Sequence, residues 1–152
     1  MKANNEEVID QLNILVEINN DRIEGYERAL HDTTDQGLKD LFRELAGHSR
    51  KNKDALSAEV TRLGGEPTTK TRNTGKIFRA WMDLKAALTG KDKKAVMKAC
   101  EFGEDSALEV YENVLKDHNV LSTEQREMVV QQRSDLMRDH ERVKSLRDAV
   151  KS

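Results

Sequence analysis

The fold is decided by the first long apolar repeat, NEEVIDQLNILVEINNDRIEGYERAL, which runs from Asn5 to Leu30. Its stripe residues follow one another in alternating steps of three and four, the spacing that places side chains on one face of an α-helix. The stripe consists of Ile9, Leu12, Val16, Asn19, Ile23, Tyr26 and Leu30. The repeat therefore predicts a long amphipathic helix.

Four later segments continue this helical pattern and are bounded by residues that commonly start or stop helices. They extend from about Gln36 to Leu63, Gly75 to Leu88, Asp92 to Lys116 and Ser122 to Val150. Asp32–Asp35 supplies turn and N-cap side chains before the second segment, and Gly64-Gly65 with Pro67 ends it. Ser122, with Gln125 three residues later, is a capping-box pattern at the start of the last segment.

The composition predicts one all-α domain covering residues 1–152. Of the 152 residues, 36% are hydrophobic and only 4% aromatic, with one proline and eight glycines. Sheet-rich folds use many β-branched, aromatic and turn residues, which are scarce here. A chain of this length is long enough to bury a single core between amphipathic helices.

The lengths of the connections predict how the helices are arranged. Segments one and two, and segments four and five, are joined by a handful of residues, so each pair should form an antiparallel hairpin. Residues 66–91 lie between the hairpins and hold one short helix, which at about 14 residues spans roughly 21 Å and can return the chain to the end it left. The predicted fold is a ferritin-like antiparallel four-helix bundle with a long crossover that contains a short fifth helix. An up-down-up-down bundle is the alternative.

Charge and motif content argue against several classes of function. Lysine plus arginine (26) nearly balances aspartate plus glutamate (28), for a net charge of −2, whereas nucleic-acid binders usually carry a basic excess. The one cysteine, Cys100, excludes an internal disulfide. Without a long apolar stretch, and with Met1–Asn5 leading straight into a polar helix, we expect a cytoplasmic protein with no membrane partner. The sequence has no Gly-rich phosphate loop and indicates no small-molecule substrate.

Polar residues interrupt the apolar stripes near the middle of each long helix. They are Asn19 on the first helix, Ser49 and Asn52 on the second with His48 and Glu59 flanking them, Glu101 and Glu104 on the fourth, and His140 on the last. Antiparallel pairing would bring these midpoints to one level inside the bundle. Buried polar groups need hydrogen-bond partners, a metal ion or water, so this layer is the candidate site.

Three interpretations of the layer are open. In the first, it is a hydrogen-bond network, with Tyr26 and Tyr111, that fixes the register of the helices and needs no cofactor. In the second, the two glutamates and two histidines bind one Zn, Fe or Mn ion, because these metals accept imidazole and carboxylate ligands together. In the third, a different register moves some of these residues to the surface. We favour the network, because buried polar pairs more often serve structure than chemistry.

A complete di-iron centre of the bundle type is excluded by motif. Such a centre needs one Glu from each of two helices and a Glu-x-x-His from each of the other two. The residues three positions before the four histidines are Arg28, Leu45, Leu115 and Met137, so no Glu-x-x-His occurs. The sequence therefore retains at most a degenerate di-iron site.

Several motifs resemble those of a known group of proteins. They are RLGGEP at 62–67, RAWMDLK at 79–85, EFGED at 101–105 with Tyr111, and HERV at 140–143 with LRD at 146–148. Together they resemble a family of uncharacterised bacterial proteins, described as ferritin-like four-helix bundles with a domain of unknown function. The likeness covers nearly the whole chain. It implies a ferritin-like fold and a bacterial cytoplasmic setting, and it brings no established activity.

A more distant resemblance to bacterioferritins implies that most metal ligands have been lost. By this resemblance, Asn19 stands at the position of their first-helix Glu ligand, and Ser49 and Asn52 stand at their second-helix Glu-x-x-His. Glu101 and His140 match two further ligands, whereas the Glu partner of that histidine is replaced by methionine. The resemblance therefore does not extend to iron storage or ferroxidase activity.

These observations lead to two hypotheses of function. The first is a non-enzymatic ferritin-like bundle, with a buried Glu/His layer in place of a di-iron site, for which the looser resemblance suggests a stress-related role. The alternative is a metal-binding redox or metal-handling protein that uses the mid-bundle Glu and His residues. Long amphipathic helices also suggest self-association into a homo-oligomer.

Overall fold

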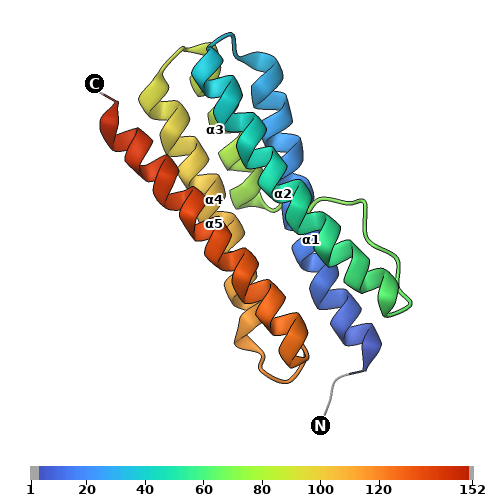
Figure 1. The fold of residues 1–152 in the computed structure, drawn as a ribbon. Helices are drawn as coiled ribbons and strands as arrows, with labels where there is room; N and C mark the ends of the chain where they lie inside the picture. The colour runs from blue at the N-terminus through green and yellow to red at the C-terminus, as the bar shows by residue number, and fades with distance from the viewer. Residues whose placement is uncertain (1–3, 151–152) are drawn as a thin grey trace.

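Five α-helices make up almost all of the computed structural model, which describes residues 4–150 (Figure 1). Residues 1–3, which belong to the Met1–Asn5 stretch used for the expected location, lie outside the described residues, as do 151–152. The helices are α1 (Asn5–Asp32), α2 (Gln36–Arg62), α3 (Gly75–Thr89), α4 (Lys93–Lys116) and α5 (Thr123–Ala149). Residues 4–150 contain no strand, so the all-α prediction is confirmed.

The helix boundaries follow from local side-chain chemistry. The Asp35 carboxylate accepts a hydrogen bond from the backbone amide three residues later, at 3.0 Å, and so starts α2. Ser122 and Gln125 form the predicted capping box at the start of α5. Thr74 occupies the N-cap position of α3 but makes no side-chain cap bond. Gly64, at φ +88°, follows α2 in the left-handed conformation that glycine adopts most easily.

Helix α1 packs along α2 and helix α4 packs along α5, while α3 packs against α4 and α1 (Figure 1). Two polar contacts show the directions of the helices. Lys93 at the start of α4 pairs with Asp35 at the start of α2, at 3.1 Å. Gln125 at the start of α5 donates to Glu59 near the end of α2, at 2.8 Å. Helices α2 and α4 therefore run in the same direction, and the crossover with α3 connects opposite ends of the molecule.

The apolar core consists of two clusters, one on each side of a polar middle. One cluster includes Leu12, Leu56 and Val129, and the other includes Phe42, Leu84 and Val143. Trp81 on α3 packs against both clusters. Its indole ring lies so close to Gly25 that a Cβ there would approach ring carbons to 2.5 Å, so only glycine fits beside it. Trp81 thus anchors the crossover helix to both halves of the core.

The buried stripes of α1 and α5 differ in part from the predicted ones. On α1, Arg22 and Ala29 are buried, whereas the neighbouring Ile23 and Leu30 are only half-buried. On α5, the buried polar positions are Gln125, Gln132 and Asp139, and His140 lies at the edge. Each shift is a single residue along the helix, or about 100° around its axis. That rotation is enough to exchange an interior residue for one at the rim.

Candidate functional site

A charged layer separates the two apolar clusters. Its centre is Arg22 on α1, whose side chain is 1% exposed. The guanidinium donates hydrogen bonds to Ser49 Oγ at 2.5 Å, Glu104 Oε1 at 2.7 Å and Asp139 Oδ2 at 3.3 Å. Tyr26 Oη donates to the same Glu104 oxygen at 2.8 Å. These five residues, which we call the charged layer, come from α1, α2, α4 and α5 and tie the four long helices together.

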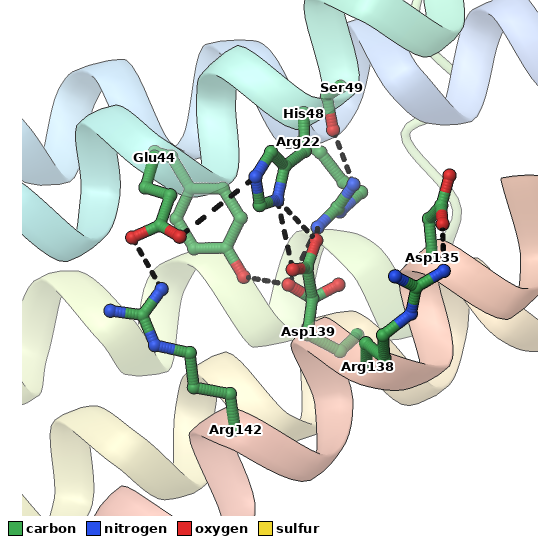
Figure 2. A network of polar contacts seen from close by, with 10 residues as sticks. Arg22, Glu44, His48, Ser49, Asp135, Arg138, Asp139 and Arg142 are labelled. Atoms are coloured by element: carbon green, nitrogen blue, oxygen red, sulfur yellow. Dashed lines mark hydrogen bonds and ion pairs between the residues drawn. The ribbon is translucent and has the colours of Figure 1, made fainter.

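His48 connects the charged layer to solvent. Figure 2 shows its ring beside Asp139, and Nδ1 lies 2.9 and 3.0 Å from the two carboxylate oxygens of that residue. The His48 side chain is 45% exposed, and its other ring nitrogen is 4.0 Å from Glu44, which in turn pairs with Arg142. The interior ion pair therefore continues into a surface network between α2 and α5.

The electrostatics of the charged layer keep Arg22 charged. Burial by itself would lower the pKa of Arg22, but the charge and hydrogen bond of Glu104, with Tyr26 and Asp139, raise this pKa above its ordinary value. Burial and the adjacent Glu104 carboxylate raise the pKa of Tyr26 well above its ordinary value. Burial also raises the pKa of the Cys100 thiol, which argues against a thiolate nucleophile at this position. The layer thus holds one buried cation, two carboxylates and a protonated phenol.

A second set of polar side chains lies one helical turn away and carries no charge. Asn19 Nδ2 donates to Tyr111 Oη at 2.8 Å, and Tyr111 Oη donates to Gln132 Oε1 at 2.7 Å. Gln132 Nε2 then donates to the backbone oxygen of Asn52 at 3.2 Å. We call these four residues the neutral layer. Burial raises the pKa of Tyr111, so its hydroxyl keeps the proton that it donates.

The structure brings some of the predicted site residues together and separates others. Asn19, Tyr26, Ser49, Asn52, Glu104 and Tyr111 are all buried and belong to the two layers. Glu101 is instead bound to Arg147, whose Nη1 lies 2.9 Å from Glu101 Oε2. The His140 side chain is 15% exposed, and its Nε2 lies 2.6 Å from Asp105. Among residues 4–150, no three His, Cys, Asp or Glu side chains are placed to share a metal ion.

Only one of the four residues predicted as metal ligands belongs to the charged layer. Of the four candidate ligands, only Glu104 lies at the centre, and its Oε1 already accepts from Arg22 and Tyr26. A divalent cation bound to Glu104 would face the positive guanidinium of Arg22 in a medium where charges interact strongly. Chemically, this arrangement holds a positive charge between two carboxylates that come from different helices.

Sequence reasoning missed three residues of the site: Arg22, Gln132 and Asp139. A signal for them exists in the spacing. Arg22 falls three residues after Asn19 and four before Tyr26, and so continues their stripe. Gln132 and Asp139 alternate at the same spacing with the buried apolar residues of α5. The spacing alone does not identify a charged residue on such a stripe as an interior one, because arginine and aspartate are rarely buried unless paired.

Comparison with known proteins identifies a family for this chain but gives no activity for it. A family model matches residues 7–117, nearly three-quarters of the chain, from the first turns of α1 through the end of α4. No curated protein matches the sequence. Within residues 4–150, no helix has the length and apolar character needed to cross a membrane. By the family match, the chain belongs to the family described as a domain of unknown function, DUF2383.

Proposed function

We propose that this protein is a non-enzymatic, ferritin-like antiparallel four-helix bundle in which the charged layer takes the place of a metal centre. The observation that carries the proposal is the position of Arg22. Its guanidinium contacts Ser49 on α2, Glu104 on α4 and Asp139 on α5, so one side chain of α1 contacts all the other long helices. The chain itself thereby supplies a cation that pairs with both buried carboxylates of the layer.

The protonation states of the buried groups also support a structural role. A general acid or base works best when its pKa lies near the operating pH. Tyr26, Tyr111 and Cys100 are all buried with pKa values raised above their ordinary ones, which holds their protons in place at neutral pH. Arg22 is held in its charged form by its carboxylate partners. The layer is thus suited to fix the register of the helices rather than to transfer protons.

The metal-handling alternative is tested by elemental analysis of protein purified without an affinity tag. Wild type is compared with Glu104→Ala, His140→Ala and, as a surface control, Glu112→Ala. We expect less than one-tenth equivalent of Zn, Fe or Mn in all four proteins. One equivalent in the wild type and in the control, lost in both Glu104→Ala and His140→Ala, would establish the metal-binding function instead.

A loading experiment makes this test independent of what the cells supplied. The purified protein is incubated with Zn²⁺, Mn²⁺ or, without oxygen, Fe²⁺, and its thermal midpoint is measured. A ligand that binds only the native state at 100 times its Kd adds about 2.7 kcal/mol to the free energy of unfolding. We expect no rise in Tm for any of the three metals. A rise that disappears in Glu104→Ala would contradict the proposal.

We further infer that residues 1–152 form one domain, because the two polar layers connect α1, α2, α4 and α5. Trp81, the single tryptophan, lies on α3 and packs against both apolar clusters. Its fluorescence and the helical circular dichroism should therefore report the same unfolding transition in urea. Two separated transitions would show that the two hairpins unfold independently.

A further inference from the structure

An open groove of about 800 Å³ runs between α1 and α3, and neither polar layer lines it. Its α1 wall extends from Asp21 to Asp32, and its α3 wall extends from Phe78 to Leu88. Each wall covers 11 or 12 residues, which corresponds to about 16 Å, or three helical turns. A third helix of about three turns has the same length as these two walls.

The α3 wall of the groove is apolar and exposed. Phe78 is 54% exposed and Met82 is 50% exposed, and the two lie one turn apart on the same face of α3. Trp81 also lines the groove, and its indole N–H has no hydrogen-bond partner among residues 4–150. Of the three large hydrophobic side chains exposed in the described part of the chain, two therefore belong to this wall; the third, Val130, is on α5. Adjacent exposed apolar side chains of this size commonly mark an interaction surface.

The α1 wall of the groove is acidic. Its carboxylates are Asp21, Glu24, Glu27 and Asp32. The groove is also lined by two cationic side chains, Arg28 and Lys85. Two of the carboxylates already have partners, since Glu24 pairs with Arg28 and Glu27 pairs with Arg50, which does not line the groove. The balance of charge over the lining is thus negative, and it faces the apolar wall across the groove.

Asp21 is the buried carboxylate of this wall. It is 5% exposed, and it accepts a hydrogen bond from the backbone N–H of Arg72 at 2.8 Å but forms no ion pair with a side chain of residues 4–150. Burial raises its pKa to about 6, and the charge of Glu24 also raises it, against backbone hydrogen bonds from Arg72 and Asn73 and the charge of Arg72, which lower it. A cation brought into the groove would stabilise the ionised form of this carboxylate.

We propose that the α1–α3 groove binds a basic amphipathic helix of about three turns, whose apolar face covers Phe78, Trp81 and Met82 and whose lysine or arginine side chains meet the carboxylates of α1. Binding of an amphipathic helix in an apolar groove is a recurring mode of recognition, read by anchors at i, i+3, i+4 and i+7. Complementary charge determines which helices are accepted. This inference is independent of the charged layer and stands whether or not that layer binds metal.

The binding test uses the single tryptophan as its reporter. A 14-residue helical peptide without tryptophan, with leucines on one face and lysines flanking them, is titrated into the full chain while Trp81 emission is recorded. We expect a saturable change with a Kd of about 10–100 μM, in the range of weak peptide recognition. A peptide with glutamate in place of every lysine should bind at least ten times more weakly.

Matched variants place the binding on the groove. Phe78→Ser and Met82→Ser should each raise the Kd of the lysine peptide by at least tenfold, whereas Val130→Ser, an equally exposed apolar site on α5, should leave it unchanged. Asp21→Asn should weaken binding of the lysine peptide severalfold and should not weaken binding of the glutamate peptide. Because Phe78, Met82 and Val130 are exposed, these variants should keep the helical circular dichroism of the wild type.

Three results would overturn the proposal. The first is the absence of a saturable change at peptide concentrations up to about 1 mM. The second is equal affinity for the lysine and glutamate peptides, or an equal loss in Val130→Ser and Phe78→Ser. The third is self-association: a molar mass that rises with protein concentration in light scattering, and falls to that of the monomer in Phe78→Ser, would show that a second copy of this chain occupies the groove.

Discussion

The charged and neutral layers both provide partners for polar side chains in the interior, but they do so in different ways. Both place hydrogen-bonding side chains from several helices inside an apolar bundle, one turn apart. The neutral layer joins Asn19, Tyr111 and Gln132 through dipoles alone. The charged layer places the guanidinium of Arg22 against the carboxylates of Glu104 and Asp139. The difference lies in what remains when one partner is removed: an unpaired dipole in one layer and an unpaired charge in the other.

This difference shows why the charged layer should be the more sensitive to substitution and the neutral layer the more tolerant. Leaving a buried neutral donor or acceptor unsatisfied costs about 1–3 kcal/mol. Removing one partner of a buried ion pair costs about 3–5 kcal/mol, because the remaining charge has lost both water and its counterion. Both layers fix helix register, but only the charged one makes that register depend on ionisation.

The largest effect is expected from Arg22→Met. The substitution keeps most of the side-chain volume but leaves Glu104 and Asp139 without their cation, so the free energy of unfolding should fall by about 3–5 kcal/mol. Urea denaturation, monitored by circular dichroism, measures this loss in the free energy of unfolding. The matched control is Arg138→Met, which removes an arginine from an exposed pair with Asp135 and should cost less than about 1 kcal/mol.

Adding Glu104→Gln to Arg22→Met sharpens this result. The double variant removes one of the two uncompensated carboxylates, so it should be more stable than the sum of the two single losses predicts. The coupling between neighbouring charged residues should exceed about 1 kcal/mol in the double-mutant cycle. Strictly additive losses would show that Arg22 and Glu104 do not act as a pair.

The next largest effect concerns Asp21, a buried carboxylate that forms no ion pair with a side chain of residues 4–150. Its folded pKa of about 6 lies above the ordinary value of 3.8, so the folded state binds the proton more tightly and ionisation destabilises it. The penalty is full above pH 6, at up to about 3 kcal/mol, and disappears as the pH falls below 4. Asp21→Asn should therefore be the more stable protein at pH 7.5 and equal to wild type near pH 4.

Urea midpoints for wild type and Asp21→Asn between pH 4 and 8 measure this pH dependence. The carboxamide oxygen can still accept the hydrogen bond from the backbone N–H of Arg72, so the contact itself is retained. A difference between the two proteins that does not change with pH would show that Asp21 does not titrate in this range. Glu104 differs from Asp21 because the buried guanidinium of Arg22 lies beside its carboxylate.

A smaller loss is expected when the neutral layer is broken. Tyr111→Phe removes the hydroxyl that accepts from Asn19 and donates to Gln132, leaving two buried amide groups short of a partner. We expect a loss of about 1–3 kcal/mol in the free energy of unfolding, with no dependence on pH between 5 and 8. If Tyr111→Phe costs as much as Arg22→Met, the distinction between the two layers fails.

The smallest effect is expected at His140. In the interior position that the sequence predicted for His140, His140→Ala would cost about 2–4 kcal/mol. The structure places its ring at the edge of the bundle, where Nε2 contacts the 59%-exposed side chain of Asp105. We now expect less than about 1 kcal/mol, as for other surface pairs. Thermal denaturation of His140→Ala and Glu104→Ala distinguishes an edge position from an interior one. The Glu104→Ala variant should lose considerably more stability.

The sequence alone was sufficient for the helices and insufficient for the membership of the layers. Helix boundaries depend on local features such as the Asp35 cap, the Ser122 capping box and Gly64, which act within a few residues. The position of Glu104 in the layer also followed from its stripe. By contrast, Glu101 and His140 were assigned to the interior by the same periodicity and lie at the rim, because a one-residue shift rotates a side chain by about 100°.

What the sequence determined about this protein is therefore a set of five amphipathic helices with their starts, ends and connections. Only the tertiary structure decided that Arg22 would meet Glu104 and Asp139, residues 82 and 117 positions away in the chain. The physical reason is that helix periodicity is a property of consecutive residues, whereas the burial of a charge depends on whether another helix supplies its counterion. The same holds for the α1–α3 groove, which exists only where two distant apolar and acidic faces come together.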